Sequence, residues 1–136
     1  MNYLSSVAQR LQGLLLGLLL VVGLFAVVSY PAAAETVQVK MGSDKSQLVF
    51  EPATVSIKAG DTVQWVNNKV YPHNIVFDKV PGDDAALAAK LSHKSLLTAP
   101  KQTVESAFVD VPAGEYSYFC TPHRGAGMVG KIIVSG

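Results

Sequence analysis

The sequence predicts an all-β domain: a sandwich of about eight short antiparallel strands with one short helix, preceded by an N-terminal signal helix. Three observations lead to this prediction. After residue 34, apolar and polar residues alternate in short runs, which is the pattern of strands that bury one face. Gly, Pro and Asn punctuate these runs at short intervals, as they do in β-sandwiches. A single stretch, residues 84–90, is alanine-rich enough for a helix.

The N-terminal segment has the three parts of an export signal. Met1–Gln12 is polar with one cation, Arg10, and Gly13–Val28 is almost wholly apolar. Three alanines then end at Ala34, so we expect cleavage there and a mature domain of residues 35–136. The alternative is a transmembrane anchor, but the apolar run is shorter than the ~20 residues that a spanning helix needs. The segment has no twin-arginine pair, which favours the general secretory route.

Charge and cysteine content exclude several classes of function. The full chain carries a formal net charge of +1, and removal of residues 1–34 takes away one cation and no acid, leaving ten basic and ten acidic residues. Nucleic-acid binding needs a basic excess or stripe, and none is visible. A neutral domain has weak long-range steering, although local patches can still orient a partner. With one cysteine, an internal disulfide is excluded.

The first half of the mature domain is expected to form four strands. They are separated by turns rich in Gly, Asp and Pro, and we place them at residues 37–41, 48–50, 54–58 and 62–66. Alternation in the fourth strand puts Val63 and Trp65 on one face, so Trp65 is expected in the core. Met41, at the end of the first strand, is expected to fill the core as well.

The second half continues with a strand at 74–77, and Pro81-Gly82 then breaks the pattern. The helix follows at 84–90, with Asp83 or Asp84 as its cap. Residues 92–101 are predicted to be loop, and His93 in this loop is expected at the surface because no other donor lies near it. Three more strands complete the domain, at 104–109, 115–120 and 129–134.

One short stretch near the C-terminus concentrates metal-binding side chains. Cys120, His123 and Met128 lie within nine positions of one another. Thiolate, imidazole and thioether form a soft donor set that suits copper, and Pro122, Gly125 and Gly127 favour a tight loop that turns the donors inward. His73, next to its own turn signal, is the candidate fourth donor. Two His, one Cys and a weak axial Met are the ligands of blue-copper electron-transfer sites. Taken alone, Cys120 could instead be a small buried hydrophobe.

Two segments resemble the copper loops of the plastocyanin family, namely Tyr116–Lys131 and Asn67–Asn68 followed by Pro72–Asp78. The segments 37–42 and 50–52 fit as well, so the resemblance covers nearly all of residues 35–136. It implies a cupredoxin Greek-key sandwich that binds one copper ion, Cu(II)/Cu(I), through His73, Cys120, His123 and Met128. It also implies that Asn74 ties the two ligand loops together by hydrogen bonds.

The resemblance further implies an electron carrier and not an enzyme. Such a carrier takes an electron from cytochrome f and delivers it to photosystem I inside the thylakoid lumen, touching these membrane complexes transiently and working as a monomer. A single export signal points to a cyanobacterial type. The implied partner surface comprises Leu48, Pro72, Phe119, Arg124, Gly125 and Ala126. The alternatives are that Leu48 is ordinary core and that Arg124 is a solvated loop charge.

The chain departs from the family pattern at three places. Phe119 stands where the family usually has tyrosine, which loses a hydroxyl but keeps the ring. Residues 78–84 mix a lysine and apolar residues with the acids, where plant members carry a dense acidic patch. Val70 stands where many members have glycine.

Four other functions remain as alternatives at this stage. One is a different exported blue-copper carrier, and another is a copper enzyme, which would need further histidines for an open metal position. A third is a periplasmic copper-binding or storage protein, for which more thiols or methionines are expected. The last is a zinc site, which would more often use paired cysteines.

Overall fold

The computed structural model describes residues 32–136, and Ala33–Gly136 forms one compact unit. It contains nine strands, one α-helix and two short 3-10 segments. Their bounds are β1 Thr36–Met41, β2 Phe50–Glu51, β3 Thr54–Lys58, β4 Thr62–Asn67, β5 His73–Lys79, η1 Pro81–Asp83, α2 Ala85–Leu91, β6 His93–Leu97, β7 Thr103–Ala107, β8 Gly114–Phe119, η2 Thr121–Ala126 and β9 Val129–Ser135.

The predicted export signal falls almost entirely on residues 1–31, outside the described residues, and it stays a prediction. Among residues 32–136, no helix is both long and apolar enough to cross a membrane.

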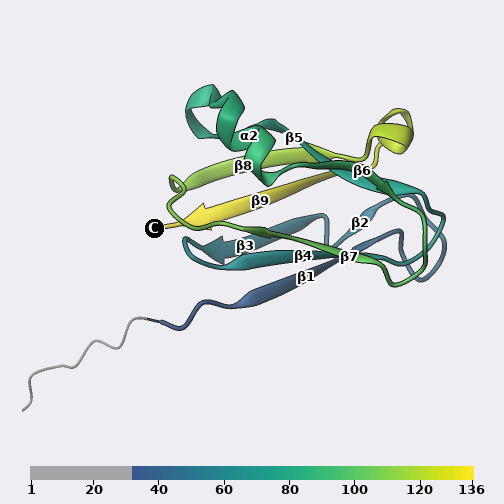
Figure 1. The fold of residues 1–136 in the computed structure, drawn as a ribbon. Helices are drawn as coiled ribbons and strands as arrows, with labels where there is room; N and C mark the ends of the chain where they lie inside the picture. The colour runs from purple at the N-terminus through teal and green to yellow at the C-terminus, as the bar shows by residue number, and fades with distance from the viewer. Residues whose placement is uncertain (1–31) are drawn as a thin grey trace, which may run out of the picture. The chain divides into compact units, whose positions relative to one another are not determined.

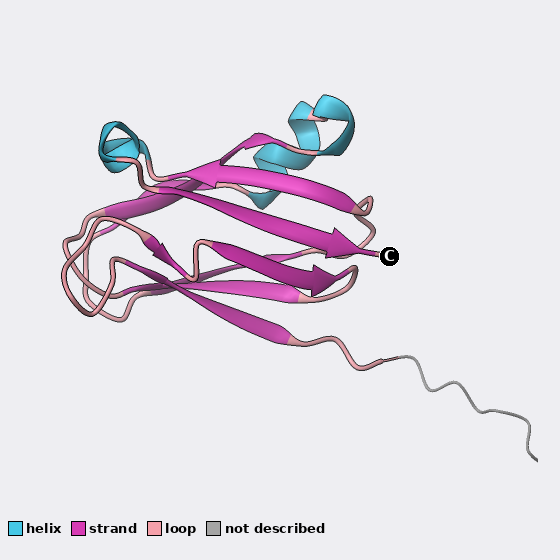
Figure 2. Ribbon diagram, turned by 180° about the vertical axis from the view of Figure 1, so that it is seen from behind, coloured by secondary structure: helices cyan, strands magenta, loops and turns pink. Residues whose placement is uncertain are grey.

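The strands form two sheets that face each other (Figures 1 and 2), which confirms the predicted sandwich. One sheet has the order β2-β1-β4-β7 and the other the order β3-β9-β8-β5-β6. The expectation of purely antiparallel pairing is wrong, because β1 pairs in parallel with β4 and β3 with β9. Alternation along a strand reveals which face is buried, but it carries no information on the direction of the neighbouring strand.

Two segments differ from the sequence prediction. The expected loop at 92–101 contains β6, an edge strand that pairs with β5 through His73↔Leu97 and Ile75↔His93. Of its five residues only Leu97 is buried, so the alternating pattern that would reveal a strand is missing. Of the expected strand at 48–50, only Phe50 lies in a strand, the two-residue β2.

The placement of His93 at the surface is also wrong. Its ring is half-buried, one ring nitrogen lies 2.9 Å from the Ser106 hydroxyl on β7, and the ring centroid lies 6.2 Å from that of Trp65. The Ser106 hydroxyl donates to the Leu91 carbonyl at 2.6 Å, so it accepts from His93. His93 thus connects β6 of one sheet to β7 of the other.

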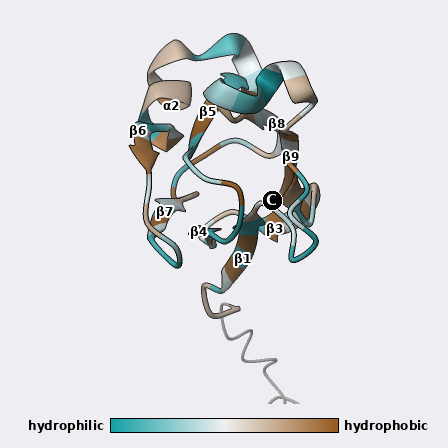
Figure 3. Cartoon of the chain, turned by 90° about the vertical axis from the view of Figure 1, so that its right-hand side faces the viewer, coloured by the Kyte–Doolittle hydropathy of each residue, from teal (hydrophilic) through white to brown (hydrophobic). Residues whose placement is uncertain are grey.

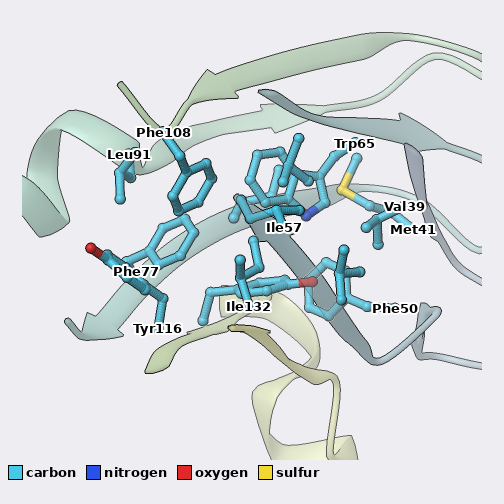
Figure 4. Close-up of a cluster of buried hydrophobic side chains, with 14 of the residues drawn as sticks. Val39, Met41, Phe50, Ile57, Trp65, Phe77, Leu91, Phe108, Tyr116 and Ile132 are labelled. Atoms are coloured by element: carbon cyan, nitrogen blue, oxygen red, sulfur yellow. The ribbon is translucent and has the colours of Figure 1, made fainter. Parts of the chain in front are cut away.

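The core fills the space between the two sheets (Figure 4). Trp65 lies at its centre, fully buried, with its ring edge-to-face against Phe77 and Tyr118 at centroid distances of 6.1 and 5.6 Å. Met41 is fully buried too, so both core predictions are confirmed. The Tyr118 ring packs directly over Gly130 of β9, where a Cβ atom would overlap it.

The helix forms where the alanine-rich sequence predicts it. The Asp84 carboxylate accepts hydrogen bonds from the N–H groups of Ala86 and Leu87, at 2.9 and 3.1 Å. Asp84 and not Asp83 is therefore the cap, because its side chain satisfies two of the free amides of the first turn.

Strand directions bring four loops to one end of the sandwich, which we call the ligand end. They are residues 42–49, 68–72, 98–102 and 120–128. This end carries η2, at the right of Figure 1, and Figure 3 views the domain from this side. The segments 32–35, 59–61, 80–92 and 108–113, with α2, occupy the opposite end.

Candidate metal centre

The predicted donor residues lie at the ligand end, on the ends of three strands of the same sheet. His73 is the first residue of β5, Cys120 follows β8 directly, His123 belongs to η2, and Met128 precedes β9. Gly127 closes the loop in the left-handed region, with φ 84°, a conformation that suits glycine. The Met128 N–H donates to the His123 carbonyl at 3.2 Å, and the Cys120 N–H donates to the Met128 carbonyl at 3.1 Å.

Three of the four donor atoms form a tight triangle. The Cys120 Sγ lies 3.6 Å from the Nδ1 atoms of both His73 and His123, and the two Nδ1 atoms are 3.2 Å apart. The point equidistant from these atoms lies about 2.0 Å from each, which is close to the ~2.0–2.3 Å of metal bonds to nitrogen and sulfur. The triangle therefore has the size that one bound transition-metal ion would need.

Hydrogen bonding prepares His73 to bind a metal through Nδ1. Its Nε2 lies 2.7 Å from the Lys69 carbonyl oxygen, which can only accept, so Nε2 carries the proton. The Nδ1 lone pair then points at the triangle. A carbonyl on the second ring nitrogen is the usual way in which proteins orient a histidine ligand.

Burial favours the uncharged forms of the donors when no metal is bound. Burial raises the pKa of the Cys120 thiol, and hydrogen bonds from the backbone at Asn74 and His123 offset part of that rise. Burial also lowers the pKa of His73, while its bond to Lys69 works in the opposite direction. A metal that takes the sulfur as thiolate must therefore displace a proton.

Met128 is the fourth candidate donor. It is fully buried, and its backbone is bonded to both His123 and Cys120, which keeps it beside the triangle. His123, by contrast, is half-buried and is the donor residue closest to solvent. Its imidazole is therefore the part of the donor set that a molecule in solution can approach most closely.

Asn74 connects the strand of one ligand to the loop of the others. Its Oδ1 accepts from the Thr121 N–H at 2.7 Å, and its Nδ2 donates to Thr121 Oγ1 at 3.1 Å and to the Lys94 carbonyl at 3.0 Å. The side chain is buried, so these bonds replace water and fix β5 against the residue that follows Cys120.

The residues expected to form a partner surface differ in exposure. Leu48 and Pro72 are half-buried, whereas Gly125 and Ala126 are exposed. Next to Pro72, Val70 and Tyr71 expose 42% and 44% of their surface. The sequence analysis assigned no role to Tyr71. Its position directly before Pro72 and the candidate ligand His73 could have identified it as an exposed aromatic residue near the metal centre.

Phe119 and Arg124 meet on the outer face of the sheet. The Arg124 guanidinium carbon lies 3.9 Å from the Phe119 ring centroid, a cation–π arrangement. The same guanidinium forms an ion pair with Asp78 at 2.9 Å. Sequence reasoning did not find Asp78, because 46 residues separate it from Arg124.

Comparison with known proteins gives a consistent result. Residues 37–135 match a family model described as "Copper binding proteins, plastocyanin/azurin family". A plastocyanin of Synechococcus sp. (strain JA-2-3B'a(2-13)) is 72% identical, and one of Nostoc punctiforme is 52% identical; both alignments cover 100% of each chain.

Solved structures show the same fold. Oxidised plastocyanin from Dryopteris crassirhizoma is 28% identical with a TM-score of 0.63, over 73% of this chain and 100% of the fern protein. Amicyanin from Paracoccus versutus is 37% identical with a TM-score of 0.55, over 79% and 86% of the two chains.

Proposed function

Because the chain belongs to the plastocyanin/azurin family of copper-binding proteins, we propose that it takes electrons from cytochrome f and delivers them to photosystem I in the thylakoid lumen. The coarser statement, that it is a blue-copper electron carrier, follows from the family and its relatives. The observation that carries the proposal is the triangle of Cys120 Sγ and the two histidine Nδ1 atoms.

Four residues would hold the copper: His73, Cys120, His123 and Met128. The ion supplies a one-electron change between Cu(II) and Cu(I), and the donor types match a type 1 site. The chain itself holds the donors still. The Lys69 carbonyl fixes the His73 ring, and Asn74 fixes the start of the loop that carries His123. A site that keeps its geometry in both oxidation states exchanges electrons with little reorganisation.

The surroundings suit electron exchange better than catalysis on a substrate. Three of the four donor residues are fully buried and only His123 reaches towards solvent. Within residues 32–136, the only cluster of three or more His, Cys, Asp or Glu side chains placed to share a metal is the triangle itself. A copper oxidase or reductase needs a further metal position that is open to substrate.

The cellular setting is part of the proposal. Relatives over the full length of the chain are plastocyanins of cyanobacteria, and the first 34 residues have the pattern of an export signal. We infer cleavage after Ala34 and transfer of a monomeric domain, residues 35–136, into the lumen. Contacts with both membrane complexes are then small and short-lived, as in other electron-transfer encounters.

Copper binding by the purified domain tests the metal centre. Addition of Cu(II) to residues 35–136 should give an intense blue colour from thiolate-to-copper charge transfer, with one copper per chain by mass spectrometry. Cys120→Ser should lose the colour. His93→Gln is the matched control, since His93 lies in β6 and bonds to Ser106, and it should stay blue. A pale product, or a preference for zinc, would contradict the proposal.

Electron transfer to the two complexes tests the physiological role. Reduced cytochrome f should reduce the blue protein, and flash-oxidised photosystem I should reoxidise it, both in fast bimolecular reactions. A blue protein that reacts with neither complex would still be a blue-copper electron carrier, but its redox partners would be other proteins.

A further inference from the structure

Cleavage after Ala34 creates a free amino group at a defined place in the fold. The bond between Ala34 and Glu35 lies one residue before β1, and residues 32–34 are exposed and lie outside the strands. Backbone of this kind is accessible to a protease. The cut converts the peptide nitrogen of Glu35 into an α-amino group, which is an ammonium ion below about pH 7.7–8.0.

The parallel pairing of β1 and β4 places this nitrogen beside Asp61. Thr36 lies opposite Thr62, so the residues that precede the two strands, Glu35 and Asp61, are neighbours. The Glu35 N–H donates to Asp61 Oδ1 at 2.9 Å. The Thr62 N–H donates to the Glu35 carbonyl at 2.8 Å. Because this second bond holds the Glu35 backbone independently of Asp61, the nitrogen stays next to the carboxylate when the chain is cut.

The Asp61 carboxylate is buried, ionised and without a charged partner. It is 6% exposed, and its Oδ2 accepts the Lys58 N–H at 2.8 Å. The N–H groups of Glu35 and Lys58 hold the pKa of Asp61 below its ordinary value of 3.8. The nearby charged side chains are those of Glu35, Lys58 and Asp110, the last on the loop after Phe108, whose N–H donates to the Asp61 carbonyl at 2.8 Å. Within residues 32–136, none of them forms an ion pair with Asp61.

We propose that Asp61 is the binding site for the new α-amino group of Glu35, and that this ion pair locks β1 onto the turn between β3 and β4 once residues 1–34 are removed. The inference rests on the proposed cleavage after Ala34. Before cleavage Asp61 accepts from a neutral amide, and afterwards it accepts from an ammonium group, which makes the stronger, charge-assisted hydrogen bond. A groove of about 250 Å³ borders the pair, so water can solvate the other hydrogens of the ammonium group.

The ion pair makes the stability of the domain depend on processing. Chains on the general secretory route cross the membrane unfolded, so weak stability of the precursor favours export. The ammonium group does not exist until the signal is removed, which happens after the chain has crossed. The mature domain therefore gains this contact in the compartment where it folds, and the precursor lacks it.

Urea unfolding of two metal-free chains that differ only at the N-terminus tests the ion pair. One chain is residues 35–136 and the other is residues 34–136, in which the Glu35 nitrogen remains a peptide amide. At about pH 6.5 the folding equilibrium constant of the first chain should be about three- to tenfold larger. The carboxylate raises the pKa of the α-amino group in the folded state, so this advantage is complete below about pH 7.7 and is lost as the pH rises through the raised pKa. At about pH 10.5 the two constants should agree within about twofold.

Two variants identify the carboxylate, and a titration needs no variant at all. Asp61→Asn keeps an acceptor oxygen but removes the charge, so the two chains that carry it should be equally stable at both pH values. Asp110→Asn removes an acid of the same end that does not contact Glu35, and it should preserve the difference. An NMR titration of the isotope-labelled terminal amine in the folded unsubstituted chains should show a higher pKa for the α-amino group of residues 35–136 than for that of residues 34–136.

Three results would overturn the inference: equal stability of the two chains at about pH 6.5, a difference that persists in Asp61→Asn, or equal pKa values of the two α-amino groups. In each case a protein that turns blue with copper would leave the carrier function standing. Cleavage at another bond, found by mass spectrometry of the exported protein, would remove the cleavage proposal and this inference together.

Discussion

Met128 is the proposed fourth ligand, and its thioether would be the weakest donor of the four. The reduction potential of a blue-copper site depends on its weakest ligand, whereas the colour depends on the thiolate. We predict that Met128→Leu stays blue and has a higher reduction potential, because loss of a donor would destabilise Cu(II). Redox titration measures the potential. Met41→Leu, at an equally buried methionine in β1, is the control, and an unchanged potential in Met128→Leu would show that Met128 is not a ligand.

Gly130 permits the close packing of Tyr118 on β9. A Cβ atom here would overlap the Tyr118 ring, whose burial among Phe50, Trp65 and Phe77 leaves it nowhere to move. We predict that Gly130→Ala costs about 1–3 kcal/mol of unfolding free energy, the usual cost of overpacking. Urea unfolding of the metal-free domain measures this. Gly125→Ala has open space around its Cβ, so equal losses in the two variants would refute the steric explanation.

At the scale of elements, the hydrogen bonds of Asn74 hold β5 against the loop of residues 120–128. Asn74→Ala removes the partner of two part-buried backbone groups, the Thr121 N–H and the Lys94 carbonyl, so we predict a loss of about 1–3 kcal/mol in unfolding free energy. Because the two ligand segments are then held less rigidly, copper binding should weaken as well. Calorimetry of the metal-free and copper-bound domains measures both effects.

Thr121→Ala removes only the Oγ1 acceptor and is the control for Asn74→Ala. It should cost less than half as much, because the Thr121 backbone N–H keeps its bond to Asn74. If the two variants lost the same stability, the bond that the Thr121 N–H donates to Asn74 Oδ1 would contribute nothing.

At the scale of the whole molecule, His93 connects the two sheets and makes folding sensitive to pH. Burial lowers the pKa of His93 below its ordinary value of 6.5, and a hydrogen bond at the Glu105 backbone offsets part of this change. The unfolded chain therefore takes up a proton at a higher pH than the folded domain. Stability is complete above the unfolded pKa and is lost as the pH falls below it.

We predict that the unfolding free energy of the metal-free domain decreases between about pH 7.5 and about pH 5.5. His73, whose pKa is also lowered, adds to the decrease. His93→Gln should make the decrease smaller, because one of the two groups that bind protons on unfolding is gone. Urea unfolding across this pH range is the measurement, and an unaltered slope in His93→Gln would exclude this role of His93.

Much of the fold was readable from local pattern. Trp65 and Met41 lie in the core as alternation predicts, and the helix begins after an aspartate cap at Asp84. Elements with weak local signals were missed. β6 forms by pairing with β5, and local alternation does not reveal it because only one of its five residues is buried. His93 was misplaced because its hydrogen-bond partner, Ser106, belongs to a strand that is distant in the sequence.

The sequence by itself determined which donors are available, because residues 120–128 contain a thiol, an imidazole and a thioether, the donor types that a soft metal site uses. It also determined the all-β class, since the period of two is local. Only the tertiary structure decided that His73 and Cys120, 47 residues apart, approach to 3.6 Å. It alone decided that β1 pairs in parallel with β4 and β3 with β9. These features depend on how distant strands pair when the sandwich closes, and no local pattern encodes that pairing.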